Sequence, residues 1–426
     1  MFGCGGASVA PVTPAPTASY QVVAISDLHF NPLYDPSLFT RLVAADPSDW
    51  DAIFQSSSVV LPSVGGTDTN YLLLMLTLAS IKQNMKNSPV VLFTGDVLGH
   101  NIPANYCKIY APLHQLTTAQ CAATQGAAIQ QFITNTFTFV AMHIGKFTGT
   151  APVIYVPGNI DAFAGGFGPD TNFLTKTSAT VYSQLLKSGF DPNTFLNTFA
   201  ADGYYSVAPL GSKLQVIGLN SNLWIVGAPA STAASTELTW LDTQLAAAQA
   251  AGQKVWILMH VPPGANSQLI AQMAAVPEQV PSAMEENPAS MMWQSALQDT
   301  FLRTLAKYPG LVTMMLAGHT HMDEFRILPT GDVLEQLPGI SPCFGNNPAF
   351  KVLTITQDTF TPTDYQSLDY NLAAMPAQFG TLYQFSTTYS AQTTWRTRSR
   401  NCIRSLPPAR ANKVCMHCST ARAVPA

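Results

Sequence analysis

Charged residues are scarce in this chain of 426 residues, and their scarcity limits what the protein binds. They make up 10% of the sequence, against about 25% in an ordinary globular protein. Ala, Thr, Gln, Ser and Asn take their place, which is typical of an exported protein. The 20 Lys and Arg against 24 Asp and Glu give a net charge of −4, so no overall basic field attracts a nucleic-acid backbone.

Long apolar runs are also lacking. The longest, "YLLLML" at 71–76, is far shorter than the roughly 20 residues that cross a bilayer, so we expect no membrane span. The N-terminal "FGCGG" is similar to the end of a bacterial lipoprotein signal, with Cys4 as the lipid-bearing residue. We expect residues 1–19 to form a flexible tether and the protein to be periplasmic or a membrane-anchored lipoprotein; a disordered start without such a role is the alternative.

Cysteine is present in small number, and its count favours disulfides. Six of the seven cysteines remain when Cys4 is set aside: Cys107, Cys121, Cys343, Cys402, Cys415 and Cys418. Six cysteines permit 15 pairings, of which Cys107 with Cys121 is the one we favour because it closes a single loop. The C-terminal "CMHC" lacks a second CxxC or a histidine pair, so we expect disulfides there rather than a metal knuckle.

Short β-rich apolar runs alternate with segments of helical period. The expected strands are 20–25, 89–93, 152–156, 214–219, 254–259 and 311–316, and the expected helices lie around 70–87, 126–146, 173–187, 235–251 and 290–307. Three later runs, "EFRIL", "DVLEQL" and "FKVLTI", have no helices between them, which suggests antiparallel additions. The pattern predicts an α/β fold with a mixed sheet over 20–361 and a C-terminal cap tied by disulfides over 362–426.

Polar side chains that bind metals follow five of the expected strands. They are Asp27 and His29, Asp96 and His100, Asn159, His260, and His319 with His321. Any one of these alone is ordinary, because a single histidine after a strand is usually a hydrogen-bonded structural residue and Gly-Asp is a common turn. Five such motifs at strand ends indicate one shared site, since open α/β sheets bind ligands at the carboxyl ends of their strands.

The motifs D-x-H, G-D, G-N-x-D, an isolated His and G-H-x-H, in this order, resemble those of the calcineurin-like metallophosphoesterases over roughly residues 20–356. A narrower resemblance is to the acid sphingomyelinase-like phosphodiesterases. It rests on "SDLHFNPLYD", on a histidine four residues after the Gly-Asp carboxylate, on the segment ending in "WILMHVPPG", and on "SPCFGNNPAFKV". The resemblance implies a four-layer α/β/β/α sandwich that holds two metal ions.

Carried over position by position, the resemblance implies two sets of ligands. Asp27, His29 and His321 would bind the first ion, Asp96 would bridge both ions, and Asn159, His260 and His319 would complete the second set. This nitrogen-rich set suits Zn²⁺, with Mn²⁺ or Fe as alternatives. A water shared by the two ions would become the attacking hydroxide while the ions hold the phosphoryl oxygens, which predicts hydrolysis of a phosphoester. We expect Asn159, His260 and His100 also to contact this small-molecule substrate.

The segment "GNID" departs from the family at Ile160, where most members carry a histidine that contacts the phosphate or protonates the leaving group. An isoleucine does neither, so we expect His100 to be the general acid. The alternative is that His100 is a loop residue that only shapes the metal site. Asp161 is expected to anchor the loop. The loss of the histidine also raises the alternative of a degenerate fold that binds a phosphorylated ligand without turnover.

Several substrates remain open. A phospholipid head group or a nucleotide comes first, although we expect no helical lipid-presenting domain of the kind that full acid sphingomyelinases carry ahead of the catalytic region. Polyphosphate is the alternative, because the related endopolyphosphatases also replace this histidine. A polyanion favours a basic groove, and the basic cluster here lies in the tail: Arg396, Arg398, Arg400, Arg404, Arg410 and Lys413. The alternative interpretations of this cluster are a solvated tail fixed by disulfides and a surface that contacts an anionic membrane. Asn346 or Asn347 either lines the site or forms a turn.

Overall fold

The computed structural model describes residues 18–86, 88–166, 170–228, 231–274, 291–374 and 377–389. The expected tether with Cys4 lies outside these residues, as do Cys402, Cys415, Cys418 and the basic cluster of the tail. Lipid anchoring and the disulfides of the tail therefore stay predictions. Among the described helices, none is long and apolar enough to cross a bilayer.

Two six-stranded sheets form the centre of the molecule. The first has the order β12-β11-β10-β1-β2-β3 and the second has the order β4-β5-β6-β7-β9-β8. The strands of the first sheet are β1 (Ser19–Ile25), β2 (Val91–Phe93), β3 (Val153–Tyr155), β10 (Ala349–Thr356), β11 (Pro362–Tyr370) and β12 (Phe379–Gln384). Those of the second are β4 (Tyr205–Val207), β5 (Leu214–Gly218), β6 (Lys254–Leu258), β7 (Val312–Ala317), β8 (Glu324–Ile327) and β9 (Val333–Gln336).

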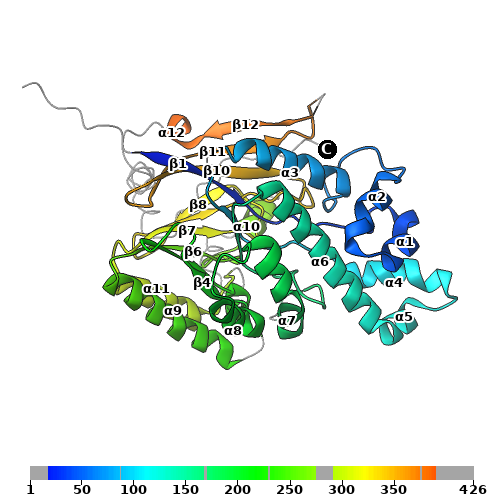
Figure 1. Ribbon diagram of the computed structural model, residues 1–426, viewed down its shortest axis with the longest axis horizontal. Coiled ribbons are helices and arrows are strands. Elements are labelled where there is room, and N and C mark those ends of the chain that lie inside the picture. Colours follow the sequence, from blue (N-terminus) through cyan, green and yellow to red (C-terminus); the bar gives the residue numbers. More distant parts are fainter. Residues whose placement is uncertain are drawn as a thin grey trace, which may run out of the picture.

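The two sheets share a core, because successive side chains of a strand point to opposite faces. On β6, Trp256 and Leu258 join the core that includes the strands of the first sheet, whereas Val255 and Ile257 join the core under α9 (Thr232–Ala250). Figure 1 shows β1, β10, β11 and β12 above β6, β7 and β8, with α9 and α11 (Ser295–Ala306) below them. The expected α/β/β/α sandwich is confirmed.

The remaining helices cover the sheets and the end of the molecule. They are α1 (Phe39–Ala44), α2 (Trp50–Gln55), α3 (Tyr71–Asn84), α4 (Ile102–Leu113), α5 (Thr118–Thr124), α6 (Gly126–Thr148), α7 (Thr171–Thr180), α8 (Pro192–Asp202), α10 (Ser267–Ala274) and α12 (Phe385–Thr388). Several begin where the sequence supplies a cap: Asn70 accepts from the backbone N–H of Leu73 at the start of α3. Asp191 caps α8, which has a proline in its first turn.

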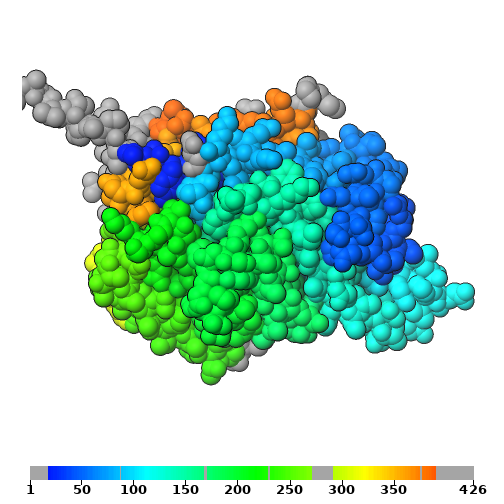
Figure 2. All heavy atoms as spheres, in the orientation of Figure 1, coloured from blue at the N-terminus to red at the C-terminus, as the bar shows by residue number. Residues whose placement is uncertain are grey.

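The disulfide Cys107–Cys121 is present and joins α4 to α5, as the sequence predicts. Both cysteines are buried, and their Cα atoms lie 5.6 Å apart. The α4–α5 pair protrudes at one end of the molecule, where its cyan surface is seen in Figure 2. The bond therefore ties together two short helices that extend beyond the main body.

The expectation of antiparallel additions after β7 is wrong for one strand. β8 and β9 are antiparallel to each other, but β9 runs parallel to its other neighbour, β7. β10 crosses to the first sheet, where it is antiparallel to β1 and begins the meander β10–β11–β12. The strand and helix rhythm fades after residue 362 because the described part of this segment forms β11 and the edge strand β12 of the first sheet, with no long helix between them.

Candidate metal centre

Five loops place the candidate ligands at one edge of the two sheets. The loops follow β1, β2 and β3 of the first sheet and β6 and β7 of the second. β1, β2 and β3 run parallel to one another, as do β6 and β7, so their carboxyl ends meet. All seven residues expected as ligands lie in these loops: Asp27, His29, Asp96, Asn159, His260, His319 and His321.

Backbone strain is concentrated in these loops. Positive φ angles occur at Asp27 (51°), His29 (44°), Asp96 (59°), His319 (76°) and His321 (56°), none of which is glycine. Such conformations cost of order 1–3 kcal/mol each and persist only where the surroundings fix them. Two hydrogen bonds do so here: the N–H of Asp27 donates to Gly95 O at 3.0 Å, and that of His29 donates to Asp96 O at 2.9 Å. The strain marks these loops as functional.

Glycine is required where the loops approach one another. A Cβ on Gly158 would lie 2.0 Å from Oδ1 of Asp96, and one on Gly318 would lie 2.0 Å from Oγ of Ser26. No side chain fits at these distances. The glycines of the G-N and G-H motifs therefore let the loop after β3 and the loop after β7 close onto the carboxylate loops.

The first group of ligand atoms contains His29, His321, Asp27 and Asp96. The Nε2 atoms of His29 and His321 lie 3.1 Å apart, and Nε2 of His29 lies 3.4 Å from Oδ2 of Asp96. Nε2 of His321 lies 3.5 Å from Oδ1 of Asp27. The ligand atoms of Asp27, His29 and His321 all lie within 4.8 Å of one another, which is close enough for one cation to bind all three.

The second group shares Asp96 with the first. Nε2 of His260 lies 3.1 Å from Oδ2 of Asp96 and 2.9 Å from Oδ1 of Asn159. Nδ1 of His319 lies 2.7 Å from the same Asn159 oxygen. Because Oδ2 of Asp96 is close to His29 on one side and His260 on the other, this carboxylate stands between two potential metal positions.

The second ring nitrogen of three histidines is bonded to the backbone. Nδ1 of His260 donates to Thr94 O at 2.7 Å, that of His29 donates to Leu98 O at 3.1 Å, and that of His321 donates to Ser341 O at 3.2 Å. These bonds fix the tautomer in which Nε2 carries the lone pair. The donor set of imidazole nitrogens, carboxylates and one amide oxygen therefore fits a pair of divalent transition-metal ions.

Without a cation, the negative charge of Asp96 is balanced by a proton on His260. Burial opposes ionisation of Asp96, but His260 and His29 hold its pKa well below the usual range. Burial likewise opposes protonation of His260, yet the charge of Asp96 raises its pKa to about 9. Burial lowers the pKa of His29 and of His319 to about 3, so both offer lone pairs. A bound cation would take the place of the His260 proton.

Asp161 ties the loop after β2 to the loop after β3. Its carboxylate accepts from the backbone N–H groups of Asp96 (3.0 Å), Val97 (2.9 Å), Leu98 (3.1 Å) and Gly158 (3.0 Å). It also accepts from the Tyr155 hydroxyl at 2.8 Å. These five bonds give Asp161 the geometry of the expected loop anchor, and they explain why a buried carboxylate stands in the turn.

Ile160 contacts the centre through its backbone. Its N–H donates to Oδ1 of Asp96 at 2.8 Å, while its side chain is 7% exposed and belongs to the hydrophobic core. The backbone of the G-N-x-D turn thus keeps its role in holding Asp96. The position supplies no side chain that exchanges a proton.

Asp68 is a residue of the site that we did not predict from the sequence. Its Oδ1 lies 2.8 Å from Nδ1 of His100, and its Oδ2 accepts from the His100 backbone N–H at 2.7 Å. The His100 ring stacks on His29 at a centroid distance of 4.2 Å. Burial lowers the pKa of His100, but the bond to Asp68 outweighs it and raises the pKa above the usual value. The segment "GGTDTN", which contains Asp68, did not indicate a site residue because it follows none of the expected strands.

Asn346 and Asn347, which the sequence offered as residues of the site or of a turn, and two further histidines have structural partners. The Asn346 amide donates to Gly339 O and Ser341 O, so it stabilises a turn. Asn347 donates to Asp369 and also belongs to this turn. His114 stacks on Tyr110 at 3.9 Å, and His143 contacts Asp51.

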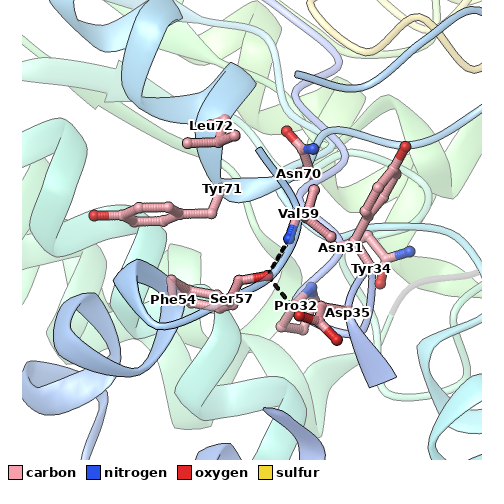
Figure 3. A pocket seen from close by; sticks show the side chains of 10 residues that line it. All are labelled: Asn31, Pro32, Tyr34, Asp35, Phe54, Ser57, Val59, Asn70, Tyr71 and Leu72. Atoms are coloured by element: carbon pink, nitrogen blue, oxygen red, sulfur yellow. Dashed lines mark hydrogen bonds between the residues drawn. The ribbon is translucent and has the colours of Figure 1, made fainter. Parts of the chain in front are cut away.

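A cavity next to the loop after β1 does not belong to the centre. Its volume is about 20 Å³, room for roughly one water molecule. Figure 3 shows Ser57 in its lining, hydrogen-bonded to Asp35 and Val59, and none of the seven candidate ligands lines it. It is too small for a substrate.

Sequence comparison identifies the class to which this site belongs. The family model described as calcineurin-like phosphoesterase matches residues 20–323. The protein is a member of the calcineurin-like phosphoesterase family and thus a hydrolytic enzyme acting on phosphoesters. The predicted resemblance to the sphingomyelinase-like branch is confirmed by the curated relatives.

The relatives are named phosphodiesterases, and three of them serve as examples. Sphingomyelinase phosphodiesterase D of Dictyostelium discoideum is 24% identical over 392 residues, which cover 85% of this chain and 75% of that protein. Sphingomyelin phosphodiesterase of Homo sapiens is 23% identical over 339 residues, covering 74% of this chain and 45% of the relative. Cyclic GMP-AMP phosphodiesterase SMPDL3A of Rattus norvegicus is 23% identical over 384 residues, covering 85% of this chain and 73% of the relative.

Solved structures give weaker matches. A dimetal phosphatase from Danio rerio aligns with a TM-score of 0.43 and 12% identity, covering 85% of this chain and 98% of that one. PhoD aligns with a TM-score of 0.40 and 11% identity, covering 87% of this chain and 70% of the PhoD chain.

The anchoring bonds of Asp161 generate the first prediction. Asp161→Asn places an amide donor against backbone donors, so the loops that carry Asp96 and Asn159 lose their common anchor. We expect metal affinity to fall about 10- to 100-fold, as measured by competition with a chelator. Asp191→Asn, at the exposed cap of α8, is the matched control and should bind metal as the unaltered chain does. Unchanged affinity in Asp161→Asn would contradict the anchoring role.

Proposed function

We propose that the protein is a two-metal phosphodiesterase in which His100 protonates the leaving group. The observation that carries this proposal is the Asp96 carboxylate between two groups of ligand atoms, with the Asp68–His100 pair stacked against one of them. The proposed substrates are organic phosphodiesters of the nucleotide or lipid head-group type. Zn²⁺ is the proposed metal.

The ligand residues set the charge of the site. Asp27 and Asp96 bring two negative charges against four positive charges from two divalent ions, which leaves a site that favours an anion. When bound, such ions supply an acidified water and neutralise charge on the phosphoryl oxygens. The protein's own contribution is to aim Nε2 of His29, His260 and His321 by bonding each Nδ1 to a backbone carbonyl.

His100 is suited to the proton transfer. Asp68 accepts from its Nδ1, which leaves Nε2 for the proton that the leaving oxygen takes. The side chain of His100 is 31% exposed, so a substrate reaches it from solvent, whereas His29 and His260 are buried. Ile160 supplies no second acid, and the step therefore depends on His100.

The surroundings of His100 favour an organic leaving group. Phe344 is 49% exposed and lies edge-on to His100 at 6.2 Å and to His321 at 4.7 Å. Three further exposed apolar residues, Val60, Leu61 and Val64, lie in the loop that leads to Asp68. Gly66 N–H donates to Pro342 O at 2.9 Å, which joins this loop to the segment carrying Phe344. An exposed aromatic ring beside His100 suits a base or an acyl group.

Polyphosphate is less well supported by the described residues. Burial and, less strongly, the charge of Arg326 lower the pKa of His319. Arg326 is completely buried, and its Nη2 lies 2.7 Å from Oε1 of Glu324. It is therefore no part of an open basic groove. The names of the relatives, which cite sphingomyelin and cyclic GMP-AMP, also favour a phosphodiester with an organic group on each side.

Asp96→Asn tests the metal centre. We expect it to abolish metal binding and phosphodiester hydrolysis together, because the bridging charge is lost. Metal analysis of the purified protein and an aryl phosphodiester assay measure the two effects. A fully active variant would contradict the assignment. An unaltered chain that binds two ions but hydrolyses no phosphoester would instead support a binding protein.

His100→Ala tests the acid. Leaving-group protonation contributes about 10²- to 10⁴-fold, and it matters most for strongly basic oxygens. We expect kcat for alkyl phosphodiesters to fall by this factor and kcat for activated aryl esters to fall far less. Asp68→Asn should likewise lower kcat more for alkyl phosphodiesters than for activated aryl esters. His114→Ala, at the Tyr110 stack, serves as the control. Equal losses on both substrate types would argue against His100 as the acid.

Phe344→Ala tests the substrate class. We expect kcat/KM to fall roughly tenfold for esters with aromatic or acyl leaving groups, corresponding to about 1.4 kcal/mol of lost apolar contact. Methyl esters should be affected little. Leu382→Ala is a suitable control because Leu382 is 52% exposed on the edge strand β12. Faster hydrolysis of long-chain polyphosphate than of any organic diester would overturn this choice of substrate.

A further inference from the structure

A third group of metal-binding side chains lies beside the two groups of the centre. It consists of Asp68, His100 and Cys343, each of which offers a ligand atom within 4.8 Å of the others. Cys343, one of the six cysteines whose count favoured disulfides, is a free thiol in the described part of the chain. The three residues come from segments far apart in the sequence: the loop before α3, the loop after β2 and the loop after β9. Tertiary folding, rather than a local turn, brings them together.

We propose that Asp68, His100 and Cys343 form a third cation site, which binds Zn²⁺ in excess and then inhibits the enzyme. A thiol sulfur, an imidazole nitrogen and a carboxylate oxygen are ligands that Zn²⁺ accepts together, whereas Mg²⁺ and Ca²⁺ prefer oxygen. Three protein ligands leave a fourth position for water. A thiol gives up its proton to solvent when it binds such an ion.

The geometry of this group is fixed by hydrogen bonds that do not involve Cys343. Asp68 holds His100 through both the ring nitrogen and the backbone N–H, at 2.8 Å and 2.7 Å. The loop of Cys343 is joined to the loop of Asp68 by the bond from Gly66 N–H to Pro342 O, at 2.9 Å. Because Oδ1 of Asp68 is already bonded to Nδ1 of His100, an ion held by both residues displaces this bond, while the bond from the His100 backbone N–H keeps Asp68 in place. All three are partly exposed, so an ion enters from solvent.

The third site should be weaker than the proposed pair. His100 stacks at 4.2 Å on His29, which belongs to the first ligand group, so a third cation is repelled by the charge of the other two. We therefore expect it to fill only after the pair is complete. An ion bound to His100 and Asp68 occupies the group that donates the proton; this inhibitory part of the inference rests on the proposed function.

The first test is spectroscopic and needs no activity. The full-length, metal-free protein is titrated with Co²⁺, and the thiolate-to-cobalt charge-transfer band in the near ultraviolet is followed. We expect this band to grow after about two equivalents, to persist in Cys418→Ser and to be lost in Cys343→Ser. Circular dichroism establishes that both variants are folded. A band that is absent from the unaltered chain, or that survives in Cys343→Ser at full intensity, would overturn the third site.

The second test measures inhibition. Rates are recorded as Zn²⁺ is raised above two equivalents, each variant being compared with its own rate at two equivalents. The half-inhibitory Zn²⁺ concentration should rise at least about tenfold in Cys343→Ser and stay unchanged in Cys418→Ser. The same half-inhibitory concentration in both variants would refute inhibition through this site. If the protein proves inactive with two ions, the proposed function fails while the cobalt titration still decides the third site.

Discussion

The Asp96 carboxylate, held between two groups of histidines, is the interaction on which the rest of the site depends. One of its oxygens lies 3.4 Å from His29 and 3.1 Å from His260, and the other accepts the backbone N–H of Ile160. Its own loop is held in turn by Asp161. Gly158 and the strained left-handed residues are consequences of this arrangement, because the loops after β2 and β3 must approach within van der Waals contact.

Much of this arrangement could be predicted from the sequence because it follows from topology. Apolar runs predicted all five strands that precede the ligand loops, and parallel strands necessarily bring their carboxyl ends to one edge. What the sequence could not supply was the pairing of distant loops. Asp68 lies in an irregular segment with no periodicity, and only the folded chain brings it to His100. The direction of β9 was missed for the same reason, since strand patterns carry no information on neighbours.

The replacement of a histidine by Ile160 gives the site its individual character. The backbone at this position still binds Asp96, so the structural role of the turn survives without the chemical one. In the proposed mechanism, protonation of the leaving group then falls to His100, which is hydrogen-bonded to Asp68 and lies edge-on to the exposed ring of Phe344. The same residue lies next to Cys343. Substrate choice and sensitivity to excess metal are thus expected to converge on a single imidazole.

Anomalous diffraction from crystals grown with Zn²⁺ or Mn²⁺ tests the central claim most directly. The account predicts two ions about 3.5–4 Å apart, with Asp96 coordinated to both, His29 and His321 on one side, and His260 and His319 on the other. A single ion, or no ion within reach of Asp96 under metal-replete conditions, would contradict it.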